Sequence, residues 1–138
     1  MVRNPSSIRP YQHVLEPLFA YMLIAARQYE NMELAGAYNV GPESRDCAMT
    51  QEVVELFSKA WGEGFSWIDA SANQKGAHRE ASYLKLDSSK ISNTFGWRPH
   101  WHIGEAVEAV VQWSKEWLSG NDVGACMDCQ IRAYLEEW

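Results

Sequence analysis

The chain has 138 residues, of which 46% are hydrophobic, and a formal net charge of −6 at pH 7. This length is enough for a hydrophobic core, so we expect residues 1–138 to form a single domain. The acidic balance argues against a nucleic-acid partner, because phosphates favour a basic surface. The longest apolar run, at 18–26, is too short to cross a bilayer, which argues against a membrane protein.

The beginning of the sequence contains no apolar segment of the kind found in secretory signals. There are three cysteines, an odd number that without such a signal indicates a reducing compartment. We therefore expect a cytoplasmic location.

The segment 17–29 is the most apolar part of the chain. Apart from two tyrosine hydroxyls, its only polar side chains are those of Arg27 and Gln28. Pro17 suits the first position of a helix, and Glu16 suits its cap. A helix with apolar side chains on most sides needs to be buried on most sides. We expect the covering layers to come from this chain or from a second copy of it, which predicts a homo-oligomer, most simply a dimer.

Helical spacing of apolar residues recurs in four further segments, and short alternating segments lie between them. The predicted helices are, in chain order, 17–29, 50–61, 88–95, 103–118 and 126–138. The predicted strands are 2–4, 8–9, 36–42, 65–69 and 82–86. Asp87 is placed to cap the third helix and Gly96 to end it. Together these elements predict a mixed α/β fold with about five helices and a small sheet.

Metal and nucleophile motifs are weak in this sequence. Cys126 and Cys129 have the spacing of half a zinc site, but no second pair follows, and on a helix this spacing is more often packing. The histidines show no triad or ligand spacing; they are His13, His78, His100 and His102. We expect no metal site and no catalytic residue among them.

The cations give the better indication of a ligand. Those in turns, strand ends and loops are Arg3, Arg9, Lys75, Arg79, Lys85 and Arg98. Guanidinium and ammonium groups that converge can bind a phosphate or diphosphate. Composition alone favours the plainer interpretation, in which these are solvated surface charges.

Four motifs follow one another along the chain: Arg9-Pro-Tyr-Gln-His-Val14, Tyr38-Asn-Val-Gly-Pro42, Glu80-Ala-Ser-Tyr-Leu-Lys-Leu-Asp-Ser-Ser-Lys90 and Phe95-Gly-Trp-Arg-Pro99. In this order they resemble the carboxy-terminal part of the CDP-glucose 4,6-dehydratase branch of the extended short-chain dehydrogenase/reductase family. Enzymes of this family act on sugar nucleotides. The resemblance extends over roughly residues 1–135.

The resemblance implies a set of substrate-binding residues. Arg9 matches an arginine that reaches the substrate diphosphate, a role suited to a bidentate guanidinium. Asn39 matches the Asn-x-Gly end of a strand beside the substrate, and Tyr83 lies near the nucleotide pocket. Arg79 stands where this branch usually has a histidine, so the nucleotide contact there departs from the family pattern.

The amino-terminal half of such enzymes carries the NAD-binding Rossmann sheet, its Gly-x-x-Gly-x-x-Gly turn and a Tyr-x-x-x-Lys catalytic pair. Neither motif occurs in this chain. We therefore expect a truncated dehydratase-like protein that has no catalytic residues or cofactor of its own and binds a nucleotide diphosphate or sugar nucleotide weakly. Two alternatives remain: a non-catalytic interaction domain that self-associates, and the carboxy-terminal half of a dehydratase divided over two chains.

Overall fold

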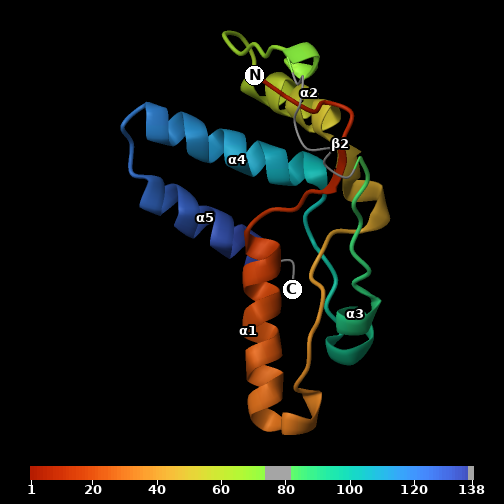
Figure 1. The fold of residues 1–138 in the computed structure, drawn as a ribbon. Helices are drawn as coiled ribbons and strands as arrows, with labels where there is room; N and C mark the ends of the chain where they lie inside the picture. The colour runs from red at the N-terminus through yellow and green to blue at the C-terminus, as the bar shows by residue number, and fades with distance from the viewer. Residues whose placement is uncertain (74–81, 137–138) are drawn as a thin grey trace.

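A computed structural model describes residues 1–73 and 82–136. Within these residues the chain forms five α-helices and a two-stranded antiparallel sheet (Figure 1). The helices are α1 (Leu15–Glu30), α2 (Thr50–Trp61), α3 (Ser89–Phe95), α4 (Ile103–Leu118) and α5 (Val123–Glu136). The strands are β1 (Ile8–Pro10) and β2 (Cys47–Met49), and short 3-10 helices cover Met32–Leu34, Ser44–Asp46 and Ser71–Asn73. The predicted mixed α/β fold is confirmed.

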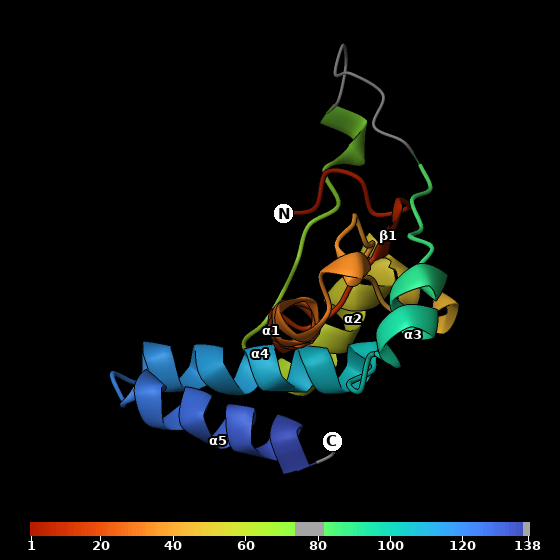
Figure 2. The same ribbon diagram turned by 90° about the horizontal axis from the view of Figure 1, so that it is seen from below.

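The helices form a packed group from which α1 projects. α4 and α5 lie side by side, and α2 packs against α4 (Figures 1 and 2). α1 begins beside this group and then extends away from it, with α3 alongside (Figure 1). No helix in the described part of the chain is long and apolar enough to cross a membrane.

Two clusters of buried side chains hold this arrangement together. One consists of Ala20, Ile91 and Trp97, and joins α1 to α3 and to the chain that follows α3. The other consists of Trp101, Ala109 and Tyr134, and joins the start of α4 to α5. Phe19 on α1 packs against both clusters, so the first turns of α1 connect the two halves of the core.

The sequence predicted that Glu16 caps α1, but in the structure it does not. The helix begins at Leu15, and Glu16 lies inside its first turn with no exposed surface. One carboxylate oxygen accepts hydrogen bonds from the backbone N–H groups of His100 (3.0 Å) and Trp101 (2.8 Å), and the other accepts from the Tyr134 hydroxyl (2.8 Å). A carboxylate with several donors can be buried, and these donors fix α1 to the 100–101 segment and to α5.

The prediction that 17–29 is buried on most sides is wrong for the single chain. Ala20 is fully buried, but Leu18, Tyr21, Met22 and Tyr29 on the other side of α1 are exposed. Among the described residues, α3 and the 38–40 segment pack in the Ala20 cluster, and α5 packs against Phe19, so the outer side of α1 has no such cluster. A helix that is apolar all round therefore has one apolar side in contact with solvent.

The sheet is smaller than the sequence predicted. β1 pairs antiparallel with β2, with Arg9 opposite Ala48, and β2 is not among the predicted strands. The predicted strand 82–86 is reduced to a parallel bridge between Ile8 and Tyr83. The predicted strands 2–4 and 65–69 are likewise reduced to a parallel bridge between Val2 and Asp69.

The predicted strand 36–42 is not a strand of a sheet. Several of its backbone carbonyls accept from side chains instead of a neighbouring strand: Lys90 Nζ donates to Ala37 O (2.9 Å), and Ser88 Oγ donates to Gly41 O (3.3 Å). Tyr38 and Val40 still pack against the Ala20 cluster, as apolar strand residues would. The segment therefore packs its apolar side chains without pairing to a neighbouring strand among the described residues.

Candidate functional site

Arg9 lies in β1, which is flanked on both sides by other segments. β2 lies along one edge, and the segment 82–84 lies along the other, where Ile8 N donates to Ser82 O (3.0 Å) and Leu84 N donates to Ile8 O (3.1 Å). The half-buried Arg9 side chain donates from Nη1 to Ile8 O (2.9 Å). This bond keeps the guanidinium close to its own strand.

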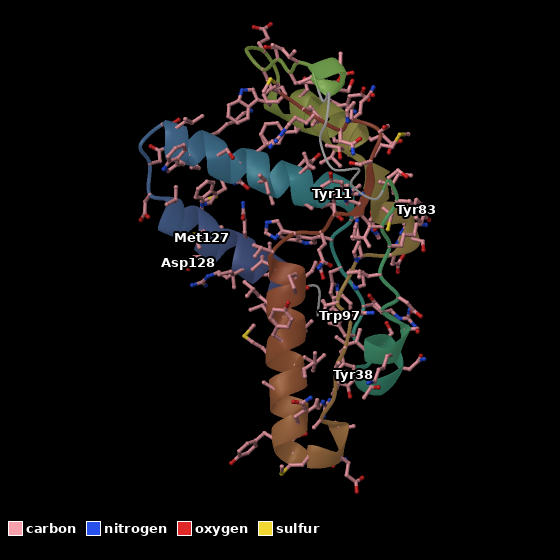
Figure 3. The ribbon with its side chains drawn as sticks, viewed as in Figure 1. Tyr11, Tyr38, Tyr83, Trp97, Met127 and Asp128 are labelled. Carbon is pink, nitrogen blue, oxygen red and sulfur yellow. The ribbon has the colours of Figure 1, made fainter. Side chains whose placement is uncertain are left out.

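Tyr83 lies on the segment next to β1, and its side chain is 55% exposed on one side of the molecule (Figure 3). The Lys85 ammonium lies 5.5 Å from the centre of the Tyr83 ring. A hydrogen bond to the Tyr83 side chain raises the pKa of Lys85 above its ordinary value. The ammonium therefore lies beside the phenol ring.

Asn39 is exposed and connects its own segment to the chain before α3. Its side-chain amide donates to Asp87 O (3.2 Å). Two residues further on, a Cβ at Gly41 would lie 3.0 Å from the Leu86 side chain, so glycine is needed for this close approach. Asn39 and Gly41 thus hold the 39–42 segment against residues 86–88.

An open cleft of about 480 Å³ lies at this contact. Its walls are the chain after Asn39, the segment after Tyr83, and the residues that follow α3. Lys85 and Arg98 are its cations, Glu43 and Asp87 its carboxylates, and the remaining polar lining is Ser44, Ser88, Ser89 and Ser92. The two cations and the hydroxyl groups can donate to phosphate oxygens, and the two carboxylates offset the positive charge.

Asp87 lines this cleft and also caps the first turn of α3. Its Oδ1 accepts from Ser89 N (2.9 Å), and hydrogen bonds from the Ser89 side chain and backbone lower the pKa of the carboxyl group. This is the capping contact that the sequence predicted, although Ser88 occupies the residue position immediately before the helix. Gly96 ends α3 in the left-handed conformation with φ of 73°, as predicted.

The candidate residues are therefore partly brought together. Arg9 and Tyr83 are on paired segments. Lys85 lies over the Tyr83 ring and also lines the cleft. Asn39 donates a hydrogen bond to the backbone of Asp87, which lines the same cleft. Arg79 lies outside the described residues. Of the other predicted cations, Lys85 and Arg98 both line the cleft.

Two of the described histidines, His13 and His102, contact buried side chains, and His78 lies outside the described residues. His13 is buried against Trp101, with its ring centroid 4.9 Å away, and its Nδ1 accepts from Leu15 N (3.3 Å). Burial lowers the pKa of His13, so the ring is neutral at pH 7. His102 Nδ1 lies 2.9 Å from the buried Asp46 carboxylate, a pair that the sequence analysis missed because its partners are far apart in the chain.

The cysteines and other possible ligands do not form a metal site in the part that the structure describes. No group of three or more His, Cys, Asp or Glu side chains gathers there. Cys126 is buried, and desolvation raises the pKa of its thiol, whereas Cys129 is exposed.

No protein-family model matches the chain. CDP-glucose 4,6-dehydratase from Salmonella typhimurium is 38% identical to it over 136 residues. The chain resembles part of this dehydratase. The match takes in 98% of the chain but only 37% of the dehydratase, so the chain spans little more than a third of that relative's length. This coverage is consistent with the carboxy-terminal part of the dehydratase, which the motifs had indicated.

Proposed function

We propose that the chain is a dehydratase-type unit that binds the diphosphate of a nucleotide or sugar nucleotide beside β1. The observation that carries this proposal is the backbone pairing of Ile8 with Tyr83. This pairing brings β1, which contains Arg9, alongside the segment that contains Tyr83. The chain also resembles an enzyme named for a sugar nucleotide.

The proposed contacts follow from the chemistry of each group. The Arg9 guanidinium supplies two parallel donors for a phosphate, and Lys85 supplies a charge held beside Tyr83. Asn39 stands at the edge of the adjoining cleft, where Arg98 adds a second cation. Arg79 belongs to the proposed set by its position in the motif, where the family usually has a histidine.

The affinity is expected to be low, because the cleft is open and water competes for every polar group. Each charge-assisted contact contributes about 1.5–3 kcal/mol at best. The immobilisation of the ligand offsets much of two or three such contacts, which leaves a Kd of about 1 mM.

Titration of the chain with CDP, followed by NMR chemical shifts, tests this proposal. We expect saturable shifts in residues of β1 and 82–88, weaker binding of cytidine, and a loss of at least tenfold in CDP affinity in Arg9→Gln. Arg132→Gln is the matched control, because Arg132 is an exposed arginine on α5. Unchanged binding in Arg9→Gln, or no shifts at about 10 mM CDP, a concentration well above the expected Kd, would contradict the proposal.

A second candidate function is that of the carboxy-terminal part of a dehydratase whose other part is a separate chain. The specific observation in its favour is that nearly the whole chain matches 37% of the relative. The test is to combine the chain with the unmatched part of the Salmonella enzyme and to measure consumption of CDP-glucose with NAD. Turnover in the mixture and in neither part alone would support this candidate.

A further inference from the structure

The exposed side of α1 is apolar along its whole length. We call Leu18, Tyr21, Met22, Ala25 and Tyr29 the outer face of α1; all five are exposed. At 3.6 residues per turn they share one side of the helix, opposite Ala20 and Glu16, which are fully buried. No charged side chain belongs to this face, and the nearby Arg27 and Glu30 pair with each other at 3.5 Å.

An apolar groove begins at one end of this outer face. It has a volume of about 360 Å³ and lies between the first turns of α1 and the facing sides of α4 and α5. Its main apolar lining residues are Val14, Leu15, Leu18, Val110, Trp113, Met127 and Ile131. Leu18 belongs both to the groove and to the outer face, so the two form one continuous apolar surface.

The other end of the outer face carries Tyr29, which is 92% exposed. Leu18 and Tyr29 lie at equal distances from a point on the helix axis midway between Met22 and Ala25. At a rise of 1.5 Å per residue, each distance is about 8 Å. A two-fold axis through this point would place Leu18 of one helix opposite Tyr29 of an antiparallel second helix. The small side chain of Ala25 lets the two helices approach at the centre.

We propose that two copies of this chain pair through the outer face of α1, with Tyr29 of each copy entering the groove of the other. A projecting aromatic ring and an apolar groove at equivalent distances from one axis make the surface complementary to itself, as an isologous dimer requires. The inference stands apart from the proposed function, since it uses none of the residues assigned to the ligand.

The area is sufficient for such a dimer. Leu18, Tyr21, Met22 and Tyr29 are 47%, 58%, 63% and 92% exposed. If a fully exposed large side chain presents about 200 Å², these four present roughly 500 Å² per copy, and the pair buries about 1,000 Å² before the groove is counted. This reaches the lower limit for specific interfaces, and the groove residues add to it.

The dimer leaves the candidate ligand site accessible. Figure 3 shows Tyr83 on one side of the molecule and Met127, which lines the groove, on the opposite side of it. Ligand binding and pairing can therefore be measured separately, and the failure of one does not decide the other.

Sedimentation equilibrium of the intact chain between about 5 and 50 µM tests the proposal, at concentrations suited to weak interfaces of this size. The measured mass of the wild-type protein is expected to approach that of two chains of 15.7 kDa each. Tyr29→Lys and Met22→Lys are each expected to raise the dimer dissociation constant at least tenfold, because a charge would be buried in an apolar contact. Tyr29→Phe should pair like the wild type, because the ring is retained.

Ile68→Lys is the matched control, since Ile68 is an apolar side chain with 67% exposure that lies outside both the face and the groove. It should leave the dimer unchanged, and circular dichroism should show all variants folded, because each substituted side chain is exposed. A monomeric wild type would overturn the proposal and leave the face to a different polypeptide. A dimer that persists in both Tyr29→Lys and Met22→Lys, or that Ile68→Lys weakens equally, would also overturn it.

Discussion

At the scale of single residues, two buried carboxylates organise the connections between elements. Glu16 binds the backbone at His100 and Trp101 and the hydroxyl of Tyr134. Asp46 accepts from Ile103 N (3.1 Å) and contacts His102, so it holds the start of α4 against the chain before β2. Each carboxylate replaces water with donors from distant parts of the chain, which makes its position specific.

Glu16→Gln is expected to lower the free energy of unfolding by about 2 kcal/mol. The amide nitrogen cannot accept a hydrogen bond, so at least one donor among the two backbone N–H groups and the Tyr134 hydroxyl loses its partner. Urea unfolding followed by circular dichroism measures the change. Glu30→Gln, at an exposed position of the same helix, is the control and should unfold like the wild type.

At the scale of elements, the ends of the helices follow local chemistry. Glu105 Oε2 accepts from His102 N (2.7 Å) at the start of α4, and Glu52 Oε2 accepts from Met49 N (2.6 Å) at the start of α2. α3 ends at Gly96, whose positive φ is unfavourable for any side chain with a Cβ atom.

Substitution of two glycines by alanine should have opposite effects. Gly96→Ala is expected to lower the free energy of unfolding by about 1 kcal/mol, because alanine disfavours a φ of 73°. Gly104→Ala, in the first turns of α4 with open space at its Cβ, should raise it by roughly 0.5 kcal/mol, because alanine loses less backbone entropy in a helix. Parallel urea titrations check both signs. Equal effects of the two substitutions would contradict this account of the α3 end.

At the scale of the whole molecule, the candidate ligand site and the outer face of α1 are separate surfaces. The ligand site lies where β1, the segment 82–88 and the chain after Asn39 meet. The outer face lies on the free side of α1, which no described part of the chain covers. The proposed binding of a nucleotide and the proposed pairing of two chains therefore use different surfaces of the molecule.

The chain alone is expected not to consume CDP-glucose in the presence of NAD. Dehydration at the sugar begins with removal of a hydride, which needs a bound nicotinamide and a base of suitable pKa. No tyrosine in the 138 residues is followed four positions later by lysine, so the Tyr-x-x-x-Lys catalytic pair of the resembled family is missing from them. Absorbance at 340 nm and chromatography of the sugar nucleotide check this, and turnover by the chain alone would contradict it.

The predicted site could be derived from the sequence only in part. The resemblance implied that Arg9, Asn39, Arg79 and Tyr83 bind the substrate, but their spacing in the sequence did not predict the distances between them in space. The pairing of Ile8 with Tyr83 joins residues that are 75 positions apart, and no local pattern encodes such a contact. The cleft lined by Lys85 and Arg98 depends in the same way on the path of the chain around α3.

The sequence by itself determined the mixed α/β class and the positions of the helices, with 50–61 and 103–118 matching α2 and α4 at both ends. Helices depend on contacts between neighbouring residues and on caps within a few positions, so their signals are local. Only the tertiary structure decided that Glu16 is buried rather than a cap, that 36–42 bonds to side chains rather than to a strand, and that α1 keeps one apolar side exposed. Each of these depends on which distant segment lies alongside, and that is settled by how the whole chain packs.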